Sequence, residues 1–458
     1  MLSTKEKAGY GLGAFGKDLA YMLSANFILY YYQDILGVSA IAMGVIIMAA
    51  RVFDAFNDPL MGVLVAKTRT RWGRFRPWLF VGTLLNAIVL YLLYTAPPKL
   101  EGSGLVAYAA IVYIIWGVTY TMMDIPFWSM IPAFTKSGDE REGLTTLARS
   151  CAGVGDALIT IIGVKAVATL GQGNEQAGFS RFALIIAIAF FAFILITCLS
   201  VKEKSTVDVD APSVKEMFRA LLQNDQAMTV VISIVLINLS LYITSGLMIY
   251  FFKYDFGGEG WRDSYTLFTA FGGGIQILSM MIFYPLIRKV LSSMQVFYTS
   301  FIMCIGGYLV MLLLMLCNVM NLYILMIPAF FVFVAFGMLT ILTTVFLANT
   351  VDYGELKNNR RDDSVIFSMQ TFVVKLASGL STLLVSICLE ITNISEIGEN
   401  DTEVVTNVAA STVGTLRMFM TIVPIAGLLI AIFIFSRKYI LTNEKLEEIN
   451  REIKARHS

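Results

Sequence analysis

The chain has 458 residues, of which 57% are hydrophobic and only 15% are charged, and its mean hydropathy is +0.73. Soluble domains carry about 25% charged residues, so the composition excludes a soluble protein with a single membrane anchor. The 34 basic and 33 acidic residues leave a net charge of +1, which gives no electrostatic reason to expect a nucleic-acid partner. A spanning helix needs about 20 apolar residues, so the apolar content suffices for about twelve helices of an all-α polytopic membrane protein.

Long apolar runs between polar loops predict two sets of six spanning helices. The first set covers residues 9–36, 39–65, 78–97, 104–134, 147–170 and 179–201. The second set covers residues 227–252, 264–288, 296–317, 321–351, 364–394 and 411–436. The longest polar stretch, 202–226, is predicted to be a cytoplasmic linker between an N-terminal half (1–201) and a C-terminal half (227–437). Residues 438–458 are predicted to be a cytoplasmic tail.

The loops predict the orientation of the helices, because short cytoplasmic loops collect Lys and Arg. The loop after the second predicted helix holds one lysine and four arginines between residues 67 and 76, whereas residues 395–410 hold no basic residue. Basic residues recur in alternate loops and in the tail. Both termini are therefore predicted to be cytoplasmic.

The sequence offers little for a membrane enzyme. The five cysteines lie in apolar runs without CxxC spacing, and the only histidine is His457 in the tail. This pattern predicts neither a disulfide framework nor a zinc site. No nucleophile or metal set is apparent, so we expect a protein that is not an enzyme and has no cofactor.

Ionisable residues inside predicted spanning helices are expensive and are functional candidates by default. We single out four acids and four bases at such positions, which could be neutral as a set: Lys17, Asp18, Arg51, Asp54, Asp58, Asp124, Arg149 and Lys375. The alternative is that these charges only pair with one another and hold the helices together.

The second predicted helix contains a candidate cation site. Asp54 and Asp58 lie one helical turn apart, so they cannot both ionise cheaply without a counter-charge. Asn57 offers a carbonyl oxygen beside them, and Thr121 could add a hydroxyl from the fourth helix. Such hard oxygen ligands suit a small monovalent cation, and a proton could neutralise the same acids. Arg51 or Lys375 could be the counter-ion in the empty site.

The fourth predicted helix contains a candidate sugar site. Tyr120, Asp124 and Trp128 repeat at four-residue spacing and therefore lie on one stripe. Carboxylates and cations bind sugar hydroxyls, and an aromatic plane packs against the apolar face of the ring. Asp18, Lys17 and Arg149 could complete the hydrogen-bonding set. Trp128 could instead be an interfacial residue.

Seven motifs along the chain are shared with one known family: GYGLGAFGKDLAY, YYYQDILG, ARVFDAFNDPLMG, TRTRWGRFRPW, TYTMMDIPFWSMIP, NTVDYGELK and SMQTFVVK. Over nearly its whole length the chain resembles the glycoside–pentoside–hexuronide:cation symporters of the major facilitator superfamily. The resemblance implies twelve helices in two six-helix halves, alternating access and a bacterial inner (cytoplasmic) membrane location. It implies symport of a sugar, most closely an α-galactoside such as melibiose, with Na⁺, Li⁺ or H⁺.

The resemblance also assigns residues. It places the cation on Asp54, Asn57, Asp58 and Thr121, with Na⁺ held by the two acids. It places the sugar on Lys17, Asp18, Tyr120, Asp124, Trp128, Arg149, Gln370, Thr371 and Lys375. A cytoplasmic gate is expected at Arg141, Asp352 and Glu355. The expected partners are the sugar, the cation and membrane lipid, with the monomer as the functional form.

Two positions depart from the melibiose-transporting members of that family. Thr340 stands where those members have an aromatic residue facing the sugar, and Asn349 replaces the first acid of a D-T-V-D-Y-G string. Two alternatives stay open. The cargo could be a glucuronide, a pentoside or another glycoside, or the chain could be a non-transporting sugar sensor.

Overall fold

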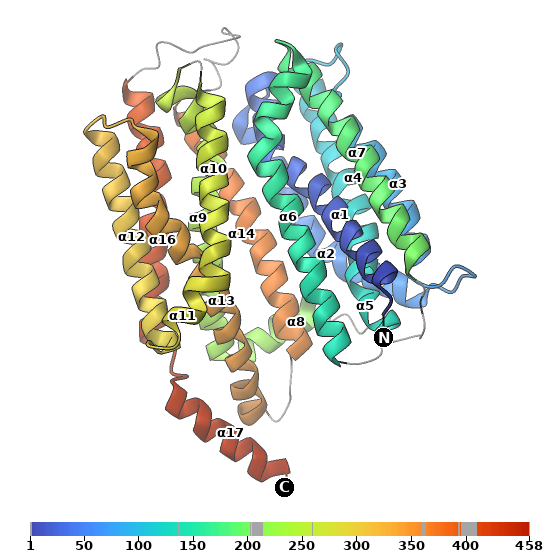
Figure 1. Cartoon of the computed structure of the whole chain (residues 1–458), viewed down its shortest axis with the longest axis vertical. Coiled ribbons are helices and arrows are strands. Elements are labelled where there is room, and N and C mark those ends of the chain that lie inside the picture. The colour runs from blue at the N-terminus through green and yellow to red at the C-terminus, as the bar shows by residue number, and fades with distance from the viewer. Residues whose placement is uncertain are drawn as a thin grey trace. The chain divides into compact units, whose positions relative to one another are not determined.

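The computed structural model describes residues 2–135, 138–201, 203, 214–258, 260–358, 363–392, 394 and 410–457. Within these residues every regular element is a helix and no named strand forms (Figure 1). Eleven helices of the described part are long and apolar enough to cross a membrane. The twelfth is α1 (Thr4–Tyr30), which is also long enough but carries Lys17 and Asp18 near its middle. The predicted all-α polytopic fold is confirmed.

The chain divides into two compact units. The first unit contains α1, the π-helical turn η1 (Tyr31–Ile35), α2 (Ala40–Lys67), α3 (Arg76–Leu93), α4 (Gly102–Ser129), α5 (Ile131–Phe134), α6 (Gly138–Gly171) and α7 (Glu175–Ser200). The second contains α8 (Val214–Gln223), α9 (Asp225–Tyr250), the π-helical turn η2 (Phe251–Phe256), α10 (Trp261–Leu278), η3 (Ser279–Phe283), α11 (Tyr284–Ile287), α12 (Ser293–Leu316), α13 (Leu322–Asn358), α14 (Asp363–Ile391), α16 (Ala410–Lys438) and α17 (Asn443–His457).

Local sequence signals explain where several helices begin. Ser3 and Glu6 form a capping box at the start of α1, since each side chain bonds the other residue's backbone N–H. Asn174 caps α7 and Asn224 caps α9, each accepting the backbone N–H three residues later at 2.9 Å. The starts of these three helices are therefore encoded by the local sequence.

Small residues let α1 pack closely against α7 in the first unit. A Cβ on Gly13 would lie 2.1 Å from the Thr197 hydroxyl, and one on Gly9 would lie 2.6 Å from Ser200. The Thr197 hydroxyl donates to the Gly9 carbonyl at 2.7 Å. Small residues and hydroxyl bonds of this kind are a common means of helix association in membranes.

The start of α3 is capped by a residue that follows α7. The Glu203 carboxylate accepts the backbone N–H groups of Arg74, Phe75 and Arg76 at 2.7, 3.0 and 3.2 Å. These N–H groups have no partner within the helix, and the positive end of the helix dipole favours a carboxylate there. The loop between α2 and α3 is thus tied to the first residues of the predicted linker.

The structure contains two short helices in segments where the sequence pattern predicts no spanning helix. The segment 202–226 includes α8, in which Leu221 is buried while Leu222 is exposed. The tail includes α17, which packs against α13. Both helices are too short and too charged to register as apolar runs. The predicted span 264–288 is also not one regular helix, because the π-helical turn η3 interrupts it.

Candidate functional site

A buried lysine joins two carboxylates in the first unit. The Lys17 ammonium of α1 lies 2.8 Å from Asp18 Oδ1 and 3.0 Å from Asp124 Oδ1 of α4. Lys17 also donates to the Tyr120 hydroxyl at 3.4 Å. The lysine side chain is 5% exposed, whereas those of the two acids are 21% and 23% exposed. The cluster therefore contains a buried ammonium group and two partly exposed carboxylates. Its formal charge is −1.

Trp128 supplies an aromatic face beside this cluster. The Arg149 guanidinium of α6 lies 4.0 Å from the centre of the Trp128 ring, and the Lys17 ammonium lies 5.0 Å from it. Both distances fall within the range of cation–π attraction. Helices α1, α4 and α6 thus bring six of the predicted sugar residues together: Lys17, Asp18, Tyr120, Asp124, Trp128 and Arg149.

The acids of α2 contact α4 and a neighbouring arginine. Thr121 donates its hydroxyl to Asp58 Oδ1 at 3.0 Å, which joins α4 to α2. Arg51 pairs with Asp54 Oδ2 at 3.5 Å, and both side chains are buried. A Cβ on Gly117 of α4 would lie 2.9 Å from Asp54 Oδ1, so the glycine makes room for this carboxylate. Asn57 is half-buried on the same helix.

The remaining predicted sugar residues belong to α14 in the second unit. Lys375 is half-buried, and the Gln370 amide donates to the Thr344 hydroxyl of α13 at 3.2 Å. The Thr371 side chain lies outside the described residues. Thr340 is exposed on α13 and bonds its own helix, with its hydroxyl donating to the Phe336 carbonyl at 2.8 Å.

The predicted cytoplasmic gate is described in part. Asp352 and Glu355 are half-buried on α13. The Arg141 side chain lies outside the described residues. Near the same end of α13, Lys357 pairs with Asp225 at the start of α9, and the Tyr353 hydroxyl donates to Asp225 at 3.1 Å. The sequence prediction did not include this contact.

Two other groups of polar residues inside the helices were not predicted. In the second unit Arg417 of α16 binds Asp255 of η2 through two hydrogen bonds of 2.8 and 2.7 Å, and the Asp255 side chain is 1% exposed. In the first unit Thr160 donates to Asp156 Oδ1 at 3.3 Å. Asp156 and Arg417 each stand alone in an apolar run, and Asp255 lies in a predicted loop, so spacing within the sequence indicated no cluster.

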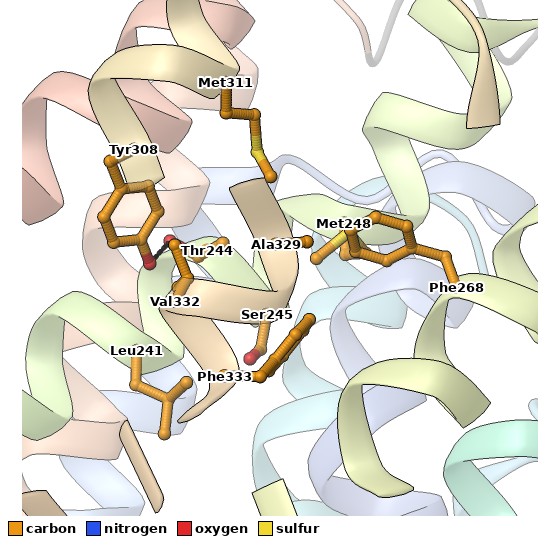
Figure 2. A pocket seen from close by; sticks show the side chains of 10 residues that line it. All are labelled: Leu241, Thr244, Ser245, Met248, Phe268, Tyr308, Met311, Ala329, Val332 and Phe333. Carbon is orange, nitrogen blue, oxygen red and sulfur yellow. Dashed lines mark hydrogen bonds between the residues drawn. The ribbon is translucent and has the colours of Figure 1, made fainter. Parts of the chain in front are cut away.

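A small cavity lies within the second unit, among α9, α10, α12 and α13 (Figure 2). Its volume is about 20 Å³, which is room for one water molecule. Apart from Ser245, its polar groups are the Thr244 and Tyr308 hydroxyls, which bond each other at 2.7 Å, as the dashed line in Figure 2 marks. This cavity is too small and too apolar to hold a sugar.

The described helices have the major facilitator fold. In a solved structure, a bacterial homologue of the human lysosomal transporter Spinster has the same fold, with a TM-score of 0.68 at 10% identity. The match covers 95% of this chain and 98% of that one. At this identity the likeness concerns the fold alone.

Sequence comparison then identifies the family. The family model described as MFS/sugar transport protein matches residues 9–443, and the chain belongs to this family. The inner membrane symporter YicJ of Escherichia coli K12 is 28% identical over 99% of this chain and 95% of its own length. A lactose permease of Lactobacillus delbrueckii subsp. bulgaricus is 28% identical over 97% of this chain and 71% of its own length.

The expected membership among the glycoside–pentoside–hexuronide:cation symporters is thereby confirmed. The protein is a membrane transporter that couples movement of a sugar to movement of a cation, and it is not an enzyme.

Proposed function

We propose that this chain is a bacterial inner-membrane symporter that carries an α-galactoside together with Na⁺, Li⁺ or H⁺. The observation that carries the proposal is the buried Lys17 between Asp18 and Asp124, beside the face of Trp128. A carboxylate accepts hydrogen bonds from sugar hydroxyls, and here one cation bridges two carboxylates. Such a preformed set of charges and an aromatic plane suits a neutral polyhydroxylated ring.

Each residue of the proposed sugar site has a role. Asp18 and Asp124 accept bonds from hydroxyls, and Lys17 holds both carboxylates in position. Trp128 packs against the apolar face of the ring, and Arg149 and Tyr120 add donors at its edge. We propose that three residues of α14 complete the site: Gln370, Thr371 and Lys375.

The proposed cation site consists of Asp54, Asn57, Asp58 and Thr121. Thr121 supports it because its bond to Asp58 links α2 to α4, the helix that carries Asp124 and Trp128. A bound cation neutralises the acids of α2 and fixes the position of α4. Because α4 carries sugar-binding residues, the affinity for the sugar rises. Linkage makes the effect reciprocal, so bound sugar raises cation affinity equally. Only the empty and the doubly loaded carrier then change conformation readily, and the ion gradient drives accumulation.

The choice of a galactoside is supported by a relative and opposed by one residue. A relative of 28% identity is a lactose permease, and lactose is a β-galactoside, so this relative supports a galactosyl ring but not its α-linkage. Thr340, however, replaces an aromatic residue of the melibiose-transporting members and offers no ring face. A glucuronide, a pentoside or another glycoside is therefore the second candidate, and competition among a panel of sugars separates the two.

The remaining proposals concern the cytoplasmic side and the assembly. We propose that Arg141, Asp352 and Glu355 form a latch that closes the cytoplasmic side in the outward-facing state. The monomer is proposed to be the functional form, surrounded by membrane lipid.

Sugar-dependent cation binding to the purified protein tests the proposal. Melibiose should raise the affinity for Na⁺ or Li⁺, or should shift proton uptake in a pH jump. Asp58→Cys should abolish the cation effect and keep weak sugar binding, whereas Glu390→Cys, at an exposed acid on α14, should change neither. Unchanged cation stimulation in Asp58→Cys would refute the site. Binding without counterflow in proteoliposomes would instead identify a sensor.

A further inference from the structure

A second polar group lies between α1 and α6, beyond the cluster around Lys17. The Asn26 amide of α1 donates to the Thr160 hydroxyl of α6 at 2.8 Å, and Thr160 donates to Asp156 Oδ1 at 3.3 Å. Asp156 follows Arg149 by seven residues on α6, so the two share a face of that helix. Asn26 follows Asp18 by eight residues, so these two share a face of α1.

Asp156 is an unusual residue to find in a spanning helix. Among the described residues it forms no ion pair, and its one side-chain hydrogen bond is to Thr160. An acid inside a membrane helix is costly unless it has a partner or a function. Bonding Thr160 alone does not require an acid, because an asparagine or a serine would accept the same hydrogen bond. A ligand that bonds this carboxylate would explain why an acid occupies the position.

The three side chains are accessible and still have capacity for hydrogen bonds. Asn26, Asp156 and Thr160 are all half-buried rather than enclosed, as is Asp18, and Arg149 is exposed. Among the described residues, Asp156 uses one oxygen toward Thr160, which leaves the second oxygen to accept. The Asn26 carbonyl oxygen and its second N–H also have no partner there. This set can accept and donate at once, as a sugar hydroxyl requires.

The spacing matches a ligand larger than one sugar ring. At 1.5 Å per residue, Asn26 lies about 12 Å along α1 from Asp18, and Asp156 lies about 10 Å along α6 from Arg149. A single hexose on Asp18 and Arg149 cannot also reach Asn26 and Thr160. A second ring, attached through a glycosidic bond, can.

We infer that Asn26, Asp156 and Thr160 form a second subsite that binds the hydroxyls of the second ring of a di- or trisaccharide glycoside. This inference rests on the proposed function, because it extends the sugar site around Asp124. The subsite favours a hydroxylated second unit over an apolar aglycone, since an apolar group would cover the Asp156 carboxylate without bonding it. The preferred cargo is therefore an oligosaccharide rather than a simple alkyl glycoside.

The test compares two probes that share the first ring: melibiose and methyl α-galactoside. Asp156→Asn should weaken melibiose binding about tenfold, as expected for loss of a charged hydrogen bond, and change methyl α-galactoside binding less than twofold. Thr160→Val should act in the same direction. Thr169→Val is the matched control, because this exposed hydroxyl on α6 donates only to its own helix at the Lys165 carbonyl.

Several other results would contradict the proposed subsite. Equal weakening of both probes would overturn the subsite and make Asp156 a positioning residue for the first ring. No change in either probe would overturn it as well, and so would a change that depends on pH but not on the second ring. If the unaltered protein binds neither probe, the proposed galactoside function fails first. Thermal melting of each variant shows whether it is folded, and Thr160→Val gives the same readout if Asp156→Asn does not fold.

Discussion

Gly117→Ala provides a direct test of the coupling between α4 and the acids of α2. The added Cβ would lie 2.9 Å from Asp54 Oδ1, whereas ordinary contact begins at 3.4 Å. The carboxylate must therefore move by about 0.5 Å, the difference between these distances. It is the end of a side chain, so it can move without unfolding the helix. Alanine is also a better helix former than glycine by about 1 kcal/mol.

The displacement is large on the scale of cation coordination. Ligand atoms in a metal site lie within about 0.2 Å of their ideal distances, so a shift of about 0.5 Å breaks the geometry. Disturbing the groups that orient metal ligands typically costs 10- to 100-fold in affinity. We expect the cation concentration for half-maximal stimulation of sugar binding to rise about tenfold, which corresponds to about 1.4 kcal/mol.

The assay titrates sugar binding with Na⁺ and Li⁺ and records the thermal midpoint of the same samples. Gly104→Ala is the control on α4, because its Cβ would meet only a Leu100 methyl at an ordinary 3.6 Å. That variant should match the unaltered protein. The reasoning is refuted if Gly117→Ala keeps the original cation dependence, or if Gly104→Ala loses it equally.

Three further changes test other contacts by thermal denaturation. Lys17→Gln should cost about 3 kcal/mol and abolish sugar binding, because Asp18 and Asp124 lose their shared cation. Arg417→Gln should cost about 3–5 kcal/mol, since it leaves the Asp255 carboxylate buried without a cation. Glu203→Ala should cost about 2 kcal/mol, because it removes the acceptor of three backbone N–H groups at the start of α3.

Each of these three has its own control. Lys17→Arg should recover more stability than sugar binding, because the larger planar cation keeps the charge but not the geometry. The double change Arg417→Gln with Asp255→Asn should cost clearly less than Arg417→Gln alone, and an equal cost would argue against charge burial. Glu203→Gln should keep part of the cap, so a loss equal to that of Glu203→Ala would contradict a carboxylate cap.

The fold was predictable because the apolar character of its long runs dominates it. Long apolar runs have to span the bilayer, and the twelve predicted spans all correspond to helices of the structure. The pattern missed α8 and α17 because both are charged and short, although the buried Leu221 beside the exposed Leu222 is an amphipathic signal. The break at η3 left no signal that hydropathy could detect, since its residues are as apolar as their neighbours.

The site could be predicted only as far as single helices allow. Four-residue spacing placed Tyr120, Asp124 and Trp128 on one stripe, because helix geometry fixes neighbours on the same helix. Pairing between helices follows no such rule, so the sequence left Arg51 and Lys375 as equal candidates for the counter-ion of the α2 acids. In the structure Arg51 pairs with Asp54.

The role of Asp156 could not be predicted either, because its contacts involve a second helix. A single acid among apolar residues indicates no site until the structure shows that Asn26 of α1 bonds Thr160, which in turn bonds the acid.

The docking of α17 determines where this chain tolerates shortening. Tyr439 stacks on Phe435 at 4.4 Å, and Leu441 and Ile449 are buried in the core of the second unit. Cutting the chain after α16 would remove these side chains and leave apolar rings of α13 and α16 facing water. A reporter or affinity tag is thus better attached beyond α17 than in its place. This charged C-terminal segment is therefore, in its packing, part of the second unit.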